Sequence, residues 1–217
     1  MQVHILSENN SILKHFLCQL RDVTVQKDSM RFRKNVHRIG EIMAYEISKS
    51  LPYAPHEVTT PLGTKKSEKI QQGILVTSVL RAGLALHEGL ISFFDDAENG
   101  FISAFRHHPN NDDYFDIVTE YKAAPSLTDK TVIIADPMLA TGLSLQAACH
   151  KLLENESPAA VHIAVVIAAP EGIEFLQNNL PDNFHLWIAD VDSHLNEKKY
   201  IVPGLGDAGD LAYGVKL

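Results

Sequence analysis

The chain has little cysteine, no excess of positive charge and no long apolar run. Only two cysteines, Cys18 and Cys149, stand among its 217 residues. Both fall at helix-patterned positions, so we expect free buried thiols in a reducing compartment and no disulfide framework. The formal net charge of −8 argues against nonspecific binding to nucleic acid, because proteins that bind it in this way present a basic surface.

Signals that send a chain to a membrane are also missing. A helix that spans a bilayer needs roughly 20 apolar residues, and no uninterrupted apolar run in this sequence is that long. The polar residues Glu8, Asn9 and Asn10 follow the short apolar start of the chain closely, which does not fit a signal peptide. The sequence therefore predicts a cytoplasmic protein with no membrane partner and no nucleic-acid partner.

What is present is the composition of an ordinary globular α/β protein. The chain is 45% hydrophobic and 21% charged, as in ordinary globular proteins. Its 217 residues suit one α/β domain with an appendage and are too few for two full domains. From residue 74 onward, strand-like and helical segments alternate. The expected strands are 74–79, 101–105, 132–135, 160–168 and 184–189, and the expected helices between them are 83–94, 143–154 and 171–179. Such an alternation predicts a twisted parallel sheet with right-handed crossovers and flanking helices.

Further segments lie outside this alternation. Apolar stripes at helical spacing predict helices at 11–21 and 31–49. The segment 59–64 has the residues of a turn between short strands, which we expect to form an arm outside the core. Residues 114–122 alternate between apolar and polar, as expected for half of a flap hairpin. The tail after Asp190 shows no regular period, and a long irregular segment in a compact domain is usually functional.

One turn has the features of a phosphate-sugar site. The strand 132–135 leads to Asp136, then to a turn of small residues ending in Thr141, Gly142 and Ser144, and then to a helix. Backbone N–H groups and the helix dipole at such a turn favour a phosphate, and the two hydroxyls add donors. Asp136, at the carboxyl end of its strand, can accept from sugar hydroxyls. The alternative is an ordinary turn with a serine as the helix N-cap.

Two arginines follow other strands of the predicted sheet. Arg81 comes directly after 74–79, in a loop whose Ala82 and Gly83 permit close backbone approach, and Arg106 follows 101–105. Their guanidinium groups suit bidentate contacts with a diphosphate. For Arg81, an ion pair with a surface carboxylate is the alternative. The adjacent His107 and His108 would point apart on a strand and have no partner at a ligand-like spacing, so we expect no metal site built from protein side chains.

These segments resemble type I phosphoribosyltransferases. Residues 132–144 resemble the motif that binds phosphoribosyl diphosphate (PRPP), in the version Asp136-Pro137-Met138-Leu139-Ala140-Thr141-Gly142 typical of uracil phosphoribosyltransferases. Leu80-Arg81-Ala82-Gly83-Leu84 resembles that family's Leu-Arg-Ala-Gly loop, and 195–210 resembles its C-terminal uracil loop. Arg31-Phe32-Arg33 with Tyr45-Glu46 fits the family's N-terminal helix. The resemblance therefore spans nearly the whole chain.

Two positions depart from the family's pattern. Leu143 replaces a usual glycine in the phosphate turn, and Lys199 replaces a usual glycine before Tyr200. A side chain restricts the backbone angles where glycine would not, but the N–H donors of the turn remain.

The resemblance implies a fold, an activity and a set of site residues. The fold would be one α/β domain with N-terminal helices and an arm (1–72), a PRPP-binding core (73–190) and a uracil-binding C-terminal hood (191–217). The activity would be that of a pentosyltransferase that converts uracil and PRPP to UMP and diphosphate. Catalytic roles would fall to Asp207, Arg81 and Arg106, and uracil would lie against Ile201, Gly206, Asp207 and Ala208. PRPP would be bound by Arg81, Arg106, Asp136, Pro137, Met138, Leu139, Ala140, Thr141, Gly142, Leu143, Ser144 and Asp207.

The resemblance also implies partners and leaves alternatives open. Any metal should be Mg²⁺ carried mainly by the diphosphate and water, because Mg²⁺ keeps its waters and binds through few carboxylates. A homodimer or a larger homo-oligomer is expected, and activation by GTP stays open. One alternative is transfer to another base, such as a 6-oxopurine. The other is a regulator that senses PRPP or UMP without turnover.

Overall fold

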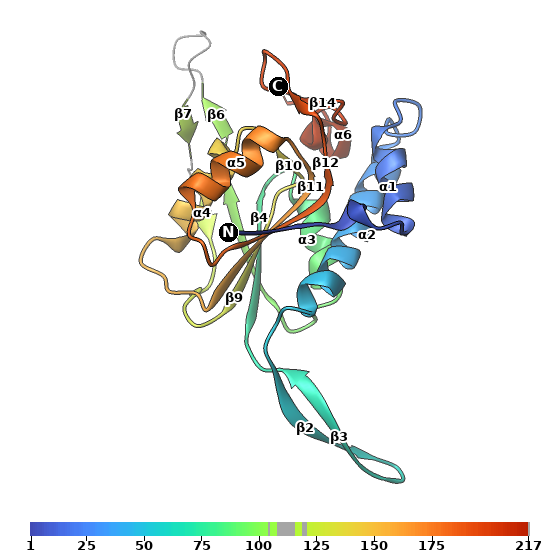
Figure 1. The fold of residues 1–217 in the computed structure, drawn as a ribbon, viewed down its shortest axis with the longest axis vertical. Helices are drawn as coiled ribbons and strands as arrows, with labels where there is room; N and C mark the ends of the chain where they lie inside the picture. The colour runs from blue at the N-terminus through green and yellow to red at the C-terminus, as the bar shows by residue number, and fades with distance from the viewer. Residues whose placement is uncertain (104, 108–115, 119–120, 217) are drawn as a thin grey trace.

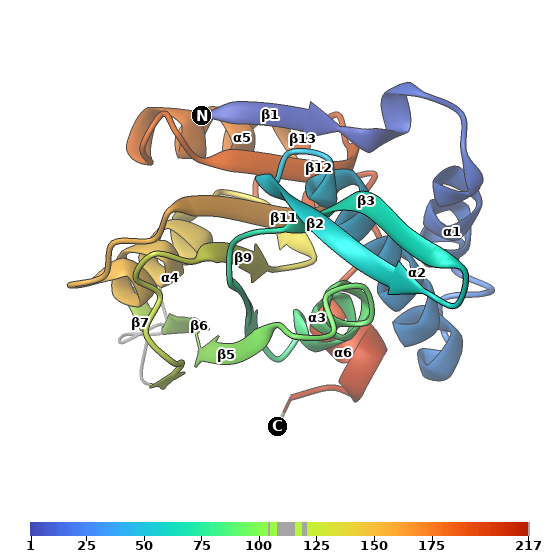
Figure 2. The same ribbon diagram turned by 90° about the horizontal axis from the view of Figure 1, so that it is seen from below.

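The computed structural model describes residues 1–103, 105–107, 116–118 and 121–216, and for 105–107 and 116–118 it describes the backbone alone. These residues form an eight-stranded sheet (Figures 1 and 2). The strand order is β1 (Gln2–Ile5), β12 (His185–Val191), β11 (Ala160–Ala168), β9 (Thr131–Ala135), β4 (Ile74–Leu80), β5 (Glu98–Ser103) and β8 (Lys122–Ala123), with β10 (Met138–Leu139) paired to β11. All pairs are parallel except β5 with β8.

Helices cover both faces of the sheet. On one face lie α1 (Ile12–Arg21), α2 (Ser29–Ser48) and α3 (Leu84–Ile91), and on the other lie α4 (Leu143–Leu153) and α5 (Pro170–Asn179). Strand β9 shows why its residues 132–135 are all apolar, since both faces of the strand are covered. Ile133 and Ala135 pack in the cluster of α1–α3, whereas Val132 and Ile134 pack in the cluster of α4 and α5. The predicted α/β fold with a parallel, doubly covered sheet is therefore confirmed. None of the helices in the described residues has the length and apolar character that crossing a membrane requires.

The structure corrects the sequence prediction at both ends of the chain. Strand β1 was not predicted, and it joins the sheet only through its parallel pairing with β12. The tail, predicted to be irregular, contains the antiparallel pair β13 (His194–Leu195) and β14 (Ile201–Val202) and the short helix α6 (Ala208–Tyr213). Elements of two to six residues are too short to show a period in the sequence.

The predicted arm is a long antiparallel hairpin. Its strands β2 (Tyr53–Thr60) and β3 (Gly63–Ile70) have eight residues each, and nearly all of their side chains are exposed. Figure 1 shows the hairpin extending away from the sheet. The expectation of an arm outside the core is confirmed, although the strands are longer than the short ones predicted.

A second hairpin stands near the predicted flap. Strand β6 (Phe105–His107) pairs antiparallel with β7 (Asp116–Val118), so that Arg106 lies opposite Ile117. This pairing agrees with a hairpin in the expected region. Lys122, the last residue of the predicted segment 114–122, belongs instead to β8 at the edge of the sheet. Tyr114 and His108 lie outside the described residues, and the side chains of β6 are not described.

Candidate active site

A cleft of about 1040 Å³ opens at the carboxyl ends of the central strands. Its walls come from the loop after β4, the segment between β9 and α4, and the hood. Most of the predicted site residues line it, namely Arg81, Asp136, Met138, Leu139, Ala140, Thr141, Gly142, Ser144, Ile201, Gly206, Asp207 and Ala208. Pro137 and Leu143 are not among the lining residues. Arg106 lies on β6, but its side chain is outside the described part of the structure.

The loop after β4 lies tightly against the end of β9. A Cβ atom at Gly83 would come within 2.5 Å of the Ala135 carbonyl oxygen, so only glycine allows this approach. Arg81 stands in the same loop. Its Nη2 donates to the Gly214 carbonyl at 3.1 Å and lies 3.4 Å from Asp210 Oδ1, which is a long contact. The Arg81 Nε is buried and has no hydrogen-bond partner among the described residues, so the guanidinium keeps donor capacity for an anion.

Asp136 is a carboxylic acid without a strong partner. It follows β9 directly, and its Oδ1 accepts only a long hydrogen bond, at 3.4 Å, from the Met138 N–H. Burial raises the pKa of Asp136 to about 7. Burial and the Asp136 charge together raise the pKa of the neighbouring Cys149 thiol to about 12. Hydroxyl donors of a ligand would therefore supply the hydrogen bonds that the Asp136 carboxylate lacks.

The turn between β10 and α4 presents an open helix N-terminus to the cleft. Gly142 is the N-cap of α4 with a left-handed φ of +84°, and no side chain caps the helix. Ser144 is the second residue of α4, so the alternative of a serine N-cap is wrong. Thr141, Gly142 and Ser144 line the cleft, and the unpaired N–H groups in the first turn of a helix favour an anion such as phosphate. Leu143 is the first residue of the helix and does not have a positive φ, so its side chain causes no backbone strain there.

The hood places a backbone loop over the other side of the cleft. Ile201 and Ala208 are buried, whereas Gly206 and Asp207 are exposed toward the cleft. Asp207 is the N-cap of α6, because its Oδ1 accepts from the Asp210 N–H at 2.9 Å. The Val202–Pro203 peptide bond is cis.

The second departure from the family's pattern falls at a special backbone position. Lys199 has a φ of +63°, a conformation that costs a residue with a Cβ atom roughly 1–2 kcal/mol. It stands in the loop between β13 and β14, where its N–H donates to the Asn196 carbonyl at 2.9 Å and the Tyr200 N–H donates to Asn196 Oδ1 at 2.9 Å. These two hydrogen bonds hold the strained conformation, and Lys199 lines the cleft.

Some lining residues were not predicted. They are Val79, Leu80, Ala82, Ser103, Leu145, Lys199, Tyr200, Gly209, Val215 and Lys216. Ser103 is the last residue of β5, whereas the sequence predicted a strand that continues to residue 105, which hid its place at a carboxyl strand end. Val215 and Lys216 reach the cleft only because the chain after α6 turns back over it, which no sequence pattern reveals.

The described residues include no group of three or more His, Cys, Asp or Glu side chains arranged to hold a metal ion. Three histidines do meet away from the cleft, on β1, β11 and β12. His4 Nε2 lies 3.3 Å from His185 Nδ1, and the His162 ring stacks on His185 with centroids 4.7 Å apart. Burial and its two histidine neighbours lower the pKa of His162 to about 3, which keeps this ring neutral.

An open helix N-terminus, an acid directly after a strand and a C-terminal hood meet around one cleft at the carboxyl edge of a parallel sheet, which is the arrangement expected for a phosphoribosyltransferase of the type I class. The family model described as uracil phosphoribosyltransferase matches residues 7–215. The chain belongs to the uracil phosphoribosyltransferase family.

Individual relatives agree with this assignment. The chain is 47% identical over 217 residues to a uracil phosphoribosyltransferase of Porphyromonas gingivalis, covering 100% of both proteins. It is 38% identical over 212 residues to one of Methanococcus vannielii, covering 95% of this chain and 88% of the relative. The solved structure of a protein from Aquifex aeolicus superimposes with a TM-score of 0.87 at 32% identity, covering 100% of both chains.

Replacing Asp136 with asparagine should weaken PRPP binding and stabilise the ligand-free protein at high pH. Losing a hydrogen bond to a charged group costs roughly 1.5–3 kcal/mol, which corresponds to about tenfold to a hundredfold in Kd. The folded pKa of about 7 lies above the unfolded value of 3.8. Stability from the protonated acid is therefore complete below about pH 4 and is lost as the pH rises toward 7. Because asparagine does not ionise, the variant should gain melting temperature over wild type as the pH rises.

Calorimetry with PRPP and thermal melts between pH 5 and pH 8 check both parts of this prediction. Asp95→Asn, at an exposed position, removes one negative charge elsewhere and serves as the control. Unchanged PRPP affinity in Asp136→Asn would mean that this acid is structural. A difference in melting temperature that does not grow with pH would contradict the raised pKa.

Proposed function

We propose that this protein transfers the phosphoribosyl group of PRPP to uracil, giving UMP and diphosphate in pyrimidine salvage. The observation that carries the proposal is the single cleft that joins Arg81, Asp136 and the open N-terminus of α4 to the hood loop. Membership of the uracil phosphoribosyltransferase family supports the choice of base.

Each wall of the cleft has a role in this reaction. The N–H groups of the turn before α4, with Thr141 and Ser144, bind the 5′-phosphate, and Asp136 accepts from the ribose hydroxyls. The bond from C1′ to the diphosphate oxygen breaks as the bond from C1′ to uracil N1 forms. Arg81 stabilises the charge that builds on the leaving diphosphate. Arg106, on β6, is proposed for the same role.

Asp207 stands between the two substrates in this proposal. Its Oδ1 accepts the Asp210 N–H at 2.9 Å, which holds the carboxylate in a fixed position at the start of α6. From there it orients the base against the sugar and accepts the N1 proton that uracil loses as the new bond forms.

The oxygen donors of the cleft fit Mg²⁺ held mainly through the diphosphate. Asp136 and Asp207 are carboxylates, and Mg²⁺ is bound through few carboxylates plus substrate phosphate oxygens and water. When bound, the ion neutralises charge on the leaving group. The protein's own contribution is to align the diphosphate, through Arg81, with the ribose held by Asp136.

The test is UMP formation from labelled uracil, PRPP and Mg²⁺. We expect turnover with all three present and none when a chelator is in excess. UMP formation at an undiminished rate with excess chelator would contradict the role of the metal. If a 6-oxopurine is used in place of uracil, the protein serves another base. If PRPP and UMP bind but no base reacts, the protein is a sensor.

The arm supports the proposal that the protein works as a homodimer or a larger homo-oligomer. An isolated two-stranded hairpin is at best marginally stable in water, and Val58 and Leu62 on this one are 40% and 100% exposed. A second copy of the chain would cover these side chains. Sedimentation should therefore give a larger mass for the whole chain than for a variant in which residues 55–68 are replaced by a short glycine-serine link. GTP is proposed only as a candidate effector, and adding it to the UMP assay is the check.

A further inference from the structure

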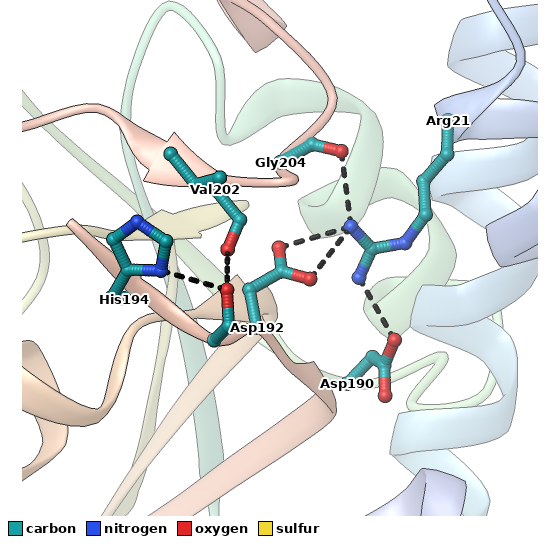
Figure 3. A network of polar contacts seen from close by, with 7 residues as sticks. Arg21, Asp190, Asp192, His194, Val202 and Gly204 are labelled. Atoms are coloured by element: carbon teal, nitrogen blue, oxygen red, sulfur yellow. Dashed lines mark hydrogen bonds and ion pairs between the residues drawn. The ribbon is translucent and has the colours of Figure 1, made fainter. Parts of the chain in front are cut away.

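A charged cluster outside the cleft ties the hood to the N-terminal helices (Figure 3). Arg21 is the last residue of α1. Its Nη1 donates to the Gly204 carbonyl at 3.0 Å and to Asp192 at 2.9 Å, and its Nη2 donates to Asp190 Oδ2 at 2.8 Å. Asp190 belongs to β12, and Asp192 follows it directly. A single guanidinium therefore joins α1, the end of β12 and the hood loop.

This cluster is largely shielded from water. The side chains of Arg21 and Asp192 are 20% and 4% exposed, so neither charge is well hydrated without the other. Burial lowers the pKa of Arg21, but the hydrogen bonds and charges of Asp192 and Asp190 outweigh burial and leave the pKa raised. The guanidinium thus stays charged. It cannot leave the Gly204 carbonyl without also leaving the buried Asp192 side chain without its partner.

The next carbonyl of the loop is held from the same side. Gln26 follows α1, and its Nε2 donates to the Leu205 carbonyl at 3.0 Å and to the Leu20 carbonyl at 2.7 Å. The Leu205 side chain is 4% exposed and packs in the apolar cluster of α1 and α2. Two consecutive carbonyls, those of Gly204 and Leu205, are therefore fixed by side chains from α1 and from the segment between α1 and α2.

Peptide geometry transmits this restraint to the cleft. The bond between Leu205 and Gly206 is trans, and in a trans peptide the C=O and N–H point in opposite directions. Because Gln26 holds the Leu205 carbonyl on the helical side, the Gly206 N–H points to the other side. Gly206 lines the cleft, and no acceptor among the described residues takes its N–H. This donor is therefore free for a ligand.

We propose that Arg21 is a positioning residue for base recognition, which acts through Gly204 and Asp192 and is assisted by Gln26. The inference rests on the proposed function, in which the loop 201–208 reads uracil. Arg21 does not line the cleft, so it touches neither substrate. It sets the position of the loop that does. Arg81 and the turn 136–144, which form the PRPP side of the cleft, have no contact with Arg21.

The experiment compares Arg21→Met with wild type in steady-state kinetics. We expect the KM for uracil to rise on the order of fivefold, as for the loss of a hydrogen bond between neutral groups, because the Gly206 N–H would lose its alignment with the base. The KM for PRPP should stay within about twofold, because no PRPP-binding residue contacts Arg21. The preference for uracil over cytosine should fall with the rise in KM. Arg21→Lys should recover part of the loss, because an ammonium can pair with Asp192 but cannot reach all three acceptors in one plane.

Arg38→Met is the matched control. Arg38 lies on α2, donates to Asn35 Oδ1 at 3.2 Å and stacks over Phe16 at 5.2 Å, so it supports the same helices without touching the hood. It should leave both KM values and base preference unchanged. If Arg21→Met does not fold, Gln26→Met and the double variant Arg21→Met/Asp192→Asn replace it, because neither leaves a buried carboxylate unpaired.

A rise in the uracil KM alone, with partial recovery in Arg21→Lys and no change in Arg38→Met, supports the inference. A lower melting temperature with both KM values unchanged overturns it, and so does an equal rise in both. A rise in the KM for uracil alone in Arg38→Met also overturns it, because the effect would then belong to the helices in general. A wild type that forms no UMP overturns the proposed function instead, so the two failures are distinguishable.

Discussion

Replacing Arg81 with alanine is expected to lower kcat/KM by about two to three orders of magnitude while the protein remains folded. Losing one charge-stabilising donor in a site closed to water costs roughly 2.7–4 kcal/mol. The fold should survive because the side chain is 38% exposed and its contacts are with the hood, at 3.4 Å to Asp210 and 3.1 Å to the Gly214 carbonyl. Steady-state kinetics and a thermal melt of the same sample measure the two effects separately.

Arg81→Lys and Arg38→Ala complete this experiment. Lysine keeps the charge but not the bidentate geometry, so its rate should lie between those of wild type and Arg81→Ala. Arg38→Ala removes an arginine away from the cleft and should stay near the wild-type rate. If the kcat/KM of Arg81→Ala is within a few-fold of the wild-type value, or if the variant simply unfolds, Arg81 does not stabilise the leaving diphosphate.

The second large effect concerns the choice of base. If the backbone of the loop 201–208 reads the edge of uracil, cytosine should be rejected strongly, because it carries an acceptor at N3 and a donor at C4. Two loop groups would then face the wrong partner. Each unpaired buried group costs about 1–3 kcal/mol, which gives about 30-fold to 10⁴-fold discrimination in kcat/KM. A small substituent such as fluorine at C5 leaves this edge unchanged and should be tolerated.

Two substitutions in the loop separate reading by backbone from reading by side chain. Val202→Ala changes a side chain and should barely alter the ratio of uracil to cytosine. Gly206→Val should lower the ratio, because Gly206 has a φ of +94° that a β-branched residue adopts only with strain. Values of kcat/KM for both bases on wild type and the two variants provide the measurement. Comparable use of cytosine by the wild type would show that this loop does not discriminate as proposed.

The two departures from the family's pattern differ in their structural consequences. Leu143 begins α4 in an ordinary helical conformation and does not line the cleft. Lys199 adopts a positive φ and does line it. Both stand where the family's pattern has a glycine. The difference arises because one position is inside a helix and the other completes a turn between strands.

The sequence predicted the parts of the protein whose signal is local. Alternating apolar segments and helices predicted the parallel sheet, because strands covered on both faces must be apolar along their whole length. The positions of Arg81 and Asp136 directly after strands predicted a common edge, because parallel strands end on the same side. The order of Asp136, Thr141, Gly142 and Ser144 predicted a turn that leads into a helix, and α4 begins there. That this turn binds a phosphate stays a prediction.

Only the tertiary structure decided what depends on pairing between distant segments. Strand β1 has four residues and joins the sheet because β12 offers it a free edge. The His162 and His185 rings stack because β11 and β12 place them opposite each other, and His4 on β1, opposite Trp187, stacks on His185 and Trp187. Arg21 meets Asp192 and Gly204 across more than 170 residues of chain. A sequence specifies such contacts only through the whole fold, since the free energy that brings these partners together comes from burying the apolar core and not from the partners themselves.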